Sequence, residues 1–101
     1  MNSRMFLYNV SIIIEDSVHQ SLFDWIKQEL LSNAHPNLKL LKMLYSPHEG
    51  QTYCLQIMLE DEEAIESIKN GIIQDLQEHI VVNFREKAFI FDSVMQYIPH
   101  Q

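Results

Sequence analysis

The sequence predicts an α+β fold in which a four-stranded antiparallel sheet carries two helices on one face. Two observations lead to this prediction. Apolar residues alternate with a period of two over residues 6–14 and 51–59, which is typical of strands that bury one face. They recur at spacings of three and four over residues 18–30 and 64–84, which is typical of helices packed on a sheet.

The first strand leads directly into the first helix. Even positions over residues 6–14 are all apolar, whereas Asn9 and Ser11 place polar groups on the other face. The period then changes, and we expect Asp16 or Ser17 to cap the free N–H groups of the following helix. The apolar side of that helix contains Val18, Leu22, Trp25, Ile26 and Leu30.

A hairpin is predicted after the first helix. Pro36 cannot continue a helix and forces an extended residue before it. Residues 38–45 are mostly Leu, Met and Tyr and are expected to form the second strand. Residues 46–50 supply turn chemistry, and the alternation that resumes at residues 51–59 predicts the third strand.

The second helical segment begins with an acidic run, Glu60 to Glu63, whose charge suits a helix N-terminus. A glycine in a helix interior costs about 1 kcal/mol relative to alanine, so Asn70-Gly71 predicts a kink or a break there. The second piece is expected to run from about Ile72 to about Arg85. Its apolar positions, with those of the first piece, are Ala64, Ile65, Ile68, Ile72, Leu76, Ile80 and Phe84.

The last strand is predicted over residues 87–97, and Pro99 ends regular structure. The order strand, helix, strand, strand, helix, strand places both helices on one sheet face, which is the ferredoxin-like arrangement. We expect one domain over residues 1–101, with residues 1–4 and 98–101 as loose ends. The predicted core comprises Tyr8, Val10, Ile12, Tyr53, Leu55 and Ile57 on the sheet, packed against Leu22, Trp25, Ile26, Ile68, Leu76 and Ile80 on the helices.

Composition excludes several classes of function. The chain has 101 residues, 47% of them hydrophobic, and a formal charge of -7 that would repel phosphate backbones, so nucleic acid is not an expected partner. Cys54 is alone, which excludes an intramolecular disulfide and favours a reducing cytoplasm. No apolar stretch approaches the length that spans a membrane, and no secretory cleavage pattern is present.

The sheet face turned away from the helices is predicted to be too apolar to remain in water. A second copy of the chain is the expected cover, because a two-fold interface uses the same patch twice. The polar side chains enclosed by such a homodimer would line a small cavity or pair across the seam. The predicted face contains Leu7, Asn9, Ser11, Ile13, Leu40, Leu44, Cys54, Gln56, Met58 and either Phe89 or Phe91.

Several segments resemble the short bacterial proteins of the family called domain of unknown function 4286. They are Tyr8 to Ile12, Glu15 to His19, Phe23 to Lys27, Leu38 to Leu44, Gln51 to Tyr53, and Phe84 to Phe91. The resemblance covers nearly the whole chain. It implies a ferredoxin-like domain related in shape to dimeric α/β barrels, an association with Bacteroidetes, and no established activity. Ile13 and Ile14 stand where the family more often has a polar strand end.

No metal or cofactor site is expected. The five histidines have no compact ligand spacing, and the acidic run lacks the alternating ligands of a hard-cation loop. Cys54 is expected to be a small buried thiol because no His or Asp is fixed near it. A small ligand pocket is predicted at Asn9, Ser11, Gln56 and His79, by analogy with dimeric α/β barrels that bind haem or oxidise flat aromatic substrates. The alternative is that Asn9 and Ser11 satisfy each other or a partner strand.

Three hypotheses of function follow. The first is a non-enzymatic dimeric module that binds a small ligand or a protein. The second is a cofactor-independent or haem-binding monooxygenase of the dimeric barrel type, with Asn9, Gln56 and His79 in its pocket. The third is a structural partner in a larger assembly. The sequence contains no catalytic motif, which favours the first over the second.

Overall fold

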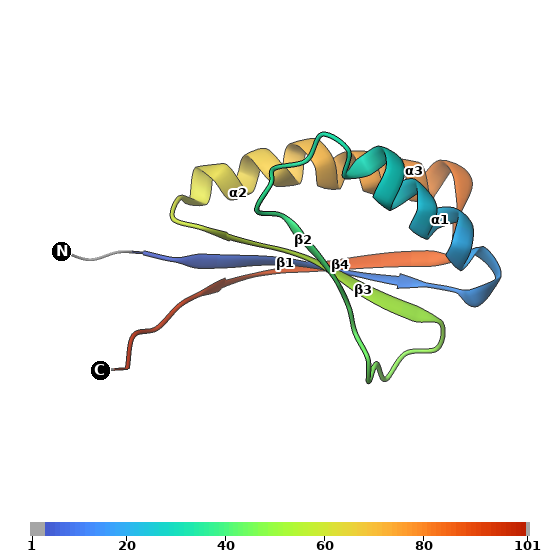
Figure 1. Cartoon of the computed structure of the whole chain (residues 1–101), viewed down its shortest axis with the longest axis horizontal. Coiled ribbons are helices and arrows are strands. Elements are labelled where there is room, and N and C mark those ends of the chain that lie inside the picture. Colours follow the sequence, from blue (N-terminus) through green and yellow to red (C-terminus); the bar gives the residue numbers. More distant parts are fainter. Residues whose placement is uncertain (1–3, 101) are drawn as a thin grey trace.

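The order of elements confirms the predicted βαββαβ arrangement. A computed structural model describes residues 4–100 of the chain (Figure 1). The elements are β1 (Phe6–Ile14), the 3-10 turn η1 (Asp16–Val18), α1 (His19–Trp25), the π segment η2 (Ile26–Leu30), β2 (Lys39–Lys42), β3 (Gln51–Leu59), α2 (Glu62–Ile68), the π segment η3 (Lys69–Ile73), α3 (Gln74–Asn83) and β4 (Ala88–Gln96).

The four strands form one antiparallel sheet in the order β2-β3-β1-β4. Both crossovers pass over the same side, so all helices cover one face, as Figure 1 shows. The central strands β1 and β3 pair along nine residues each, from Phe6 opposite Leu59 to Ile14 opposite Gln51. The fold therefore has two layers, one of helices and one of strands, and no helix of the described residues covers the other face of the sheet.

The core lies between the sheet and the helices. Burial alternates along β1, where each even residue from Phe6 to Ile14 is buried. All six sheet residues of the predicted core are buried, and so are four of the six helix residues, whereas Trp25 and Ile68 are half-buried. The two-residue and three-to-four-residue periods thus locate the core correctly, because burial on one face is what produces them.

Both helical runs contain a π segment. The irregularity expected at Asn70-Gly71 is present as η3, but the helical run continues through it to Asn83 rather than breaking. The segment η2 at the end of α1 was not predicted; there Leu31 N donates to Ile26 O at 2.9 Å, the five-residue step of a π turn.

The predicted cap of the first helix is wrong. Neither Asp16 nor Ser17 accepts a bond from a helix N–H; Ser17 Oγ instead donates to Glu15 Oε1 at 3.0 Å, and α1 begins through the turn η1. The acidic run does start the second helix. Asp61 Oδ1 accepts a hydrogen bond from Glu63 N at 2.8 Å, which satisfies one of the free N–H groups.

The second strand is shorter than expected. Only Lys39–Lys42 pair regularly with β3, and the chain then turns into a long loop. Leu40 lies opposite Leu55 and therefore faces the helices, which corrects its predicted position. Leu41, opposite Cys54, takes its place on the face away from the helices, while Leu44 lies beyond the strand and is 74% exposed. Residues 38–45 are apolar at both odd and even positions, so the sequence alone could not show which of them face the helices.

Just outside β1 and β4, Tyr97 N donates to Met5 O at 2.8 Å, which extends the pairing of these two strands. The expected loose ends at residues 1–3 and 101 fall outside the described residues. Residues 98–100 are exposed and irregular, while Arg4 forms an ion pair with Glu62 at 3.4 Å. Within residues 4–100, no helix combines the length and apolar character needed to cross a bilayer.

Candidate functional site

We call the sheet side away from the helices the open face. The strand register assigns to it Leu7, Asn9, Ser11 and Ile13 of β1, Lys39 and Leu41 of β2, Thr52, Cys54, Gln56 and Met58 of β3, and Phe89, Phe91, Ser93 and Met95 of β4. Phe89 lies opposite Ile13 and Phe91 opposite Ser11, so both aromatic side chains belong to it. Both of the predicted alternatives are thus correct.

A row of hydrogen-bonded polar groups crosses the middle of the open face. Gln56 Nε2 donates to Asn9 Oδ1 at 2.9 Å, and Asn9 Nδ2 donates to Ser11 Oγ at 3.1 Å. Ser11 Oγ lies 3.7 Å from Cys54 Sγ. The structure therefore brings together three of the four predicted pocket residues, and it also shows the alternative contact in which Asn9 and Ser11 satisfy each other.

Most of the large apolar side chains around this row are exposed to solvent. Phe91 is 60% exposed and Phe89 is 52% exposed, although aromatic rings contribute strongly to burial energy when covered. Lys39, at the margin on β2, is the only charged residue that the register of the described strands assigns to this face. An acidic chain thus keeps its carboxylates away from one broad apolar surface.

Two shallow hollows lie at opposite ends of the open face. One, of about 320 Å³, lies between Ser11, Phe91 and the β2–β3 loop residues Pro47 and His48. That loop extends to the side away from the helices in Figure 1, and Ser46 Oγ lies 2.9 Å from Thr52 Oγ1 at its base. The other, of about 340 Å³, is lined by Asn37, Lys39, Leu41, Gln56, Ile57, Met58 and Leu7.

His79 does not belong to this surface, which corrects the predicted pocket. Its ring stacks on Trp25 with centroids 3.6 Å apart and an interplanar angle of 4°, in the helical layer. Asn83 Nδ2 donates to His79 Nδ1 at 3.2 Å, and burial lowers the pKa of His79. The sheet separates this ring from Asn9. The helical spacing shows that His79 is next to the apolar side of α3. It does not show whether the ring packs against the other helix or points toward the sheet.

The buried tyrosines of the sheet are satisfied on the helix side. Tyr8 Oη donates to Asp92 Oδ2 at 2.8 Å, and burial together with that carboxylate raises the pKa of Tyr8. Tyr53 Oη lies 2.7 Å from His19 Nε2, and burial raises the pKa of Tyr53. The first contact joins the neighbouring strands β1 and β4, and the second joins β3 to α1, so both support the fold.

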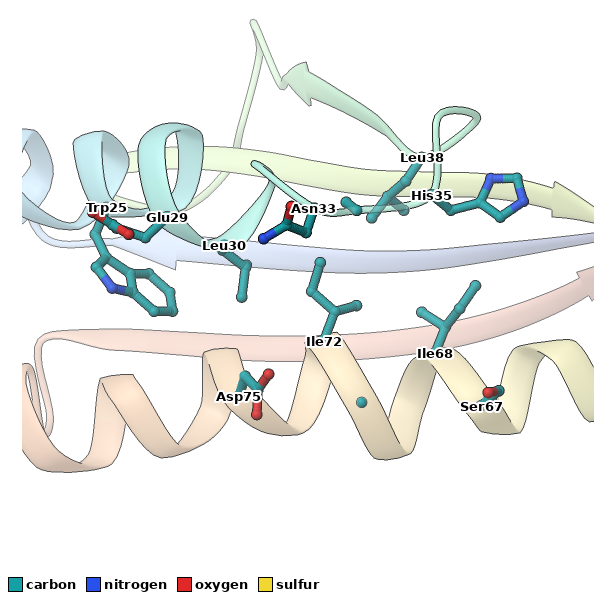
Figure 2. A pocket seen from close by; sticks show the side chains of 12 residues that line it. Trp25, Glu29, Leu30, Asn33, His35, Leu38, Ser67, Ile68, Ile72 and Asp75 are labelled. Atoms are coloured by element: carbon teal, nitrogen blue, oxygen red, sulfur yellow. The ribbon is translucent and has the colours of Figure 1, made fainter.

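A groove that the sequence did not reveal lies between the two helical runs (Figure 2). We call it the interhelical groove; its volume is about 550 Å³. Its lining residues are Trp25, Glu29, Leu30, Asn33, Ala34, His35, Leu38, Ser67, Ile68, Gly71, Ile72 and Asp75. They come from two segments, residues 25–38 and 67–75, which are separated by more than 28 positions in the chain. No local sequence pattern therefore marks the groove.

Over residues 4–100, no three His, Cys, Asp or Glu side chains are grouped so that they could hold a metal ion. What the open face can do chemically is bury apolar surface around a short row of neutral hydrogen-bonding groups.

Comparison with known proteins agrees with this architecture. The family model described as domain of unknown function (DUF4286) matches residues 5–98. No curated protein matches the chain significantly. Among solved structures, a protein of unknown function from Nitrosomonas europaea is similar with a TM-score of 0.63 at 15% identity, covering 100% of this chain and 96% of its own.

Two further structures share the fold. A dimeric ferredoxin-like protein from an uncultured marine organism has a TM-score of 0.51 at 12% identity, covering 99% of this chain and 100% of its own. A protein of the ethyl tert-butyl ether d (ethd) family from Bacillus halodurans has a TM-score of 0.56 at 9% identity, covering 87% of this chain and 96% of its own. At these identities the likeness concerns the ferredoxin-like fold alone.

Proposed function

The chain belongs to the DUF4286 family, and from that premise we propose that it is a homodimeric binding module without enzymatic activity. In this proposal two open faces pack together about a two-fold axis. The row formed by Asn9, Ser11 and Gln56 then borders the space inside the seam, where a small, largely apolar ligand binds. The observation that carries the proposal is the exposure of Phe89 and Phe91 on an almost uncharged face.

Charge supports a second copy as the occupant. Two chains of net charge -7 repel each other in general, but the strand register assigns no carboxylate to the open face. Glu15, Asp16 and Glu49 lie only at its margin, around a hollow beside Ile13 and Phe89. A two-fold interface also needs a self-complementary patch, and a neutral row inside an apolar margin meets that need. The polar groups of the row already bond to one another, so burying them leaves few unpaired groups.

The size of the face is also suitable. The three nine-residue strands are about 30 Å long and together about 14 Å wide, and the four-residue β2 adds a patch of about 13 by 5 Å, which gives a flat area on the order of 500 Å². Side-chain relief and the β2–β3 loop, whose Leu44 and Tyr45 are 74% and 93% exposed, add to this. The total approaches the roughly 800 Å² per partner of an ordinary specific interface. The dimeric ferredoxin-like protein from the marine organism offers a precedent for self-association of this fold.

The ligand would contact both hollows of the open face. Each hollow combines apolar walls with one member of the polar row, Ser11 in one and Gln56 in the other. A partner face would close both from above. Mostly apolar walls with a few polar groups, among which Lys39 is charged, fit a largely apolar small molecule. We also propose a reducing cytoplasm as the location, since Cys54 is a free buried thiol.

The monooxygenase hypothesis loses its only titratable group, because His79 stacks on Trp25 in the other layer. No observation favours it. A structural role in a larger assembly would use the same apolar face, and the oligomer measurement separates it from the homodimer.

The proposal is tested by the mass of the protein in solution. Light scattering should give about twice the 12.0 kDa of one chain at micromolar concentration. Phe91→Glu should give a monomer, because two added carboxylates would be buried against each other. Val82→Glu is the matched control, since it adds the same charge at a residue of α3 that is 79% exposed. A monomeric wild type, or equal effects of both substitutions, would disprove the homodimer.

A further inference from the structure

The interhelical groove has one wall from each helical run, and both apolar and polar side chains line it. One wall comes from α1, η2 and the following loop, and the other from α2, η3 and the start of α3. Figure 2 shows Trp25 and Glu29 toward one end, Leu30 and Asp75 next to them on opposite walls, Ile72 in the middle, and Ile68, Ser67 and His35 toward the other end. The groove belongs to the helical layer, so the proposed dimer interface does not include it.

The backbone is irregular on both sides of this groove. Each helical run changes to π geometry over five residues, at Ile26–Leu30 and at Lys69–Ile73, and both segments contribute lining residues. A π turn carries one more residue than an α turn and is less favourable, so π turns occur frequently at functional sites. Two of them facing one cavity form the first sign of a binding site.

Gly71 is the second sign. A Cβ built at this position would meet no atom within 4 Å, and its backbone is helical, so neither a close contact nor a left-handed backbone requires glycine there. A helix-interior glycine nevertheless costs about 1 kcal/mol relative to alanine. Because Gly71 lines the groove, the missing side chain leaves the groove wall bare and allows close approach to the backbone.

The charged side chains that line the groove favour a cationic ligand. Glu29 and Asp75 contribute two carboxylates, and the lining contains no Lys or Arg. Within residues 4–100 neither carboxylate takes part in an ion pair. Trp25 adds an indole ring; His79 stacks on one face of it, which leaves the other face to attract a cation.

We infer that the interhelical groove binds an organic cation with an apolar body. The cationic group lies toward the end near Trp25, Glu29 and Asp75, where carboxylates and an aromatic ring act together. The apolar body extends over Ile72 and Ile68. A volume of about 550 Å³ suits a small molecule of this kind. The inference stands apart from the proposed dimer, because the two sites use opposite sides of the sheet.

The experiment uses hexyltrimethylammonium as the probe and hexanesulfonate, with the same tail and the opposite charge, as its control. Trp25 is the single tryptophan of the chain, so its emission reports occupancy of the groove. The cation should change this emission saturably and shift the methyl resonances of Ile68 and Ile72, whereas hexanesulfonate should do neither. Equal responses to both probes, or no response at millimolar concentration, would overturn the inference.

Three variants test the position of the site. Gly71→Leu should abolish binding because its side chain enters open space in the groove. The double variant Glu29→Gln/Asp75→Asn should weaken binding about fivefold, as expected for two exposed charge pairs. Glu60→Gln removes an exposed carboxylate outside the groove and should leave binding unchanged. If Glu60→Gln weakened binding as much as the double variant, the effect would be one of net charge alone and the site would be refuted; the double variant decides this even if Gly71→Leu does not fold.

Discussion

The two glycines of the chain provide a matched pair for a stability experiment, because their surroundings are opposite. At Gly71 the backbone is helical and a Cβ would stand in open space. At Gly50 the backbone φ is +82°, and a Cβ would lie 2.2 Å from the carbonyl oxygen of Ile14. Alanine at each position therefore tests whether glycine is required by the fold or only tolerated.

Gly71→Ala should raise the free energy of unfolding. Alanine lowers the cost of helical order by about 0.8–1.0 kcal/mol, and no contact must shift to admit it. For a domain of 101 residues, about 1 kcal/mol corresponds to a rise of about 4 °C in Tm. Gly71→Ala also adds little volume, so the groove should keep most of its space.

Gly50→Ala should have the opposite sign. A left-handed backbone costs a residue with a Cβ about 1–2 kcal/mol. The contact with the Ile14 carbonyl adds to this, because one backbone segment must move away from the other. We expect a total loss of about 2–4 kcal/mol, at the upper end of ordinary single substitutions.

Urea unfolding followed by far-ultraviolet circular dichroism measures both effects. All samples should have the same protein concentration, because a dimer would make the midpoint depend on it. If Gly71→Ala lost more than about 0.5 kcal/mol, the helix propensity argument would fail and η3 would need glycine for its own geometry. That result would also remove one of the two signs that mark the interhelical groove.

Two further predictions concern buried polar groups. The pKa of His79 is lowered in the folded protein, so the unfolded chain binds its proton more readily, and stability should fall as the pH drops below about 6.5 toward the folded pKa. Trp25 emission should report this titration, and His79→Gln should flatten the change whereas His48→Gln, in an exposed loop, should not. Tyr8→Phe should cost about 1–2 kcal/mol in urea unfolding, because it removes the hydrogen bond to Asp92. A similar loss from Tyr45→Phe, at a side chain that is 93% exposed, would contradict this assignment.

The sequence was most informative where one element buries one face. The alternation around Val10 and Leu55 placed both strands and their buried sides correctly, and the spacing of Leu76 and Ile80 did the same for the second helical run. It failed at Leu40, because residues 38–45 are apolar at both parities and only pairing with β3 decides the side. Periodicity records burial, so it cannot orient a segment that is apolar on both sides.

In the candidate site, too, the sequence could place residues on the strands but could not show how the helices pack. Asn9, Ser11 and Gln56 could be grouped because they lie on strands whose pairing the hairpin order predicts. His79 could not be placed, because its position depends on how α3 packs against Trp25. The interhelical groove could not be predicted, because its lining residues come from two segments far apart in the chain, although Asn70-Gly71 did mark the irregularity at η3.

The two proposed surfaces divide the chemistry of the molecule between its layers. The register of the described strands assigns no carboxylate to the open face, where a second acidic chain would repel it, whereas two carboxylates line the groove, where they would attract a cation. One sheet buries Val10 toward the helices and holds Asn9 toward the seam, so its alternation serves both surfaces at once. Because the core separates them, loss of the dimer in Phe91→Glu need not disturb the groove, and filling the groove in Gly71→Leu need not disturb the dimer. Each proposal can therefore fail without the other.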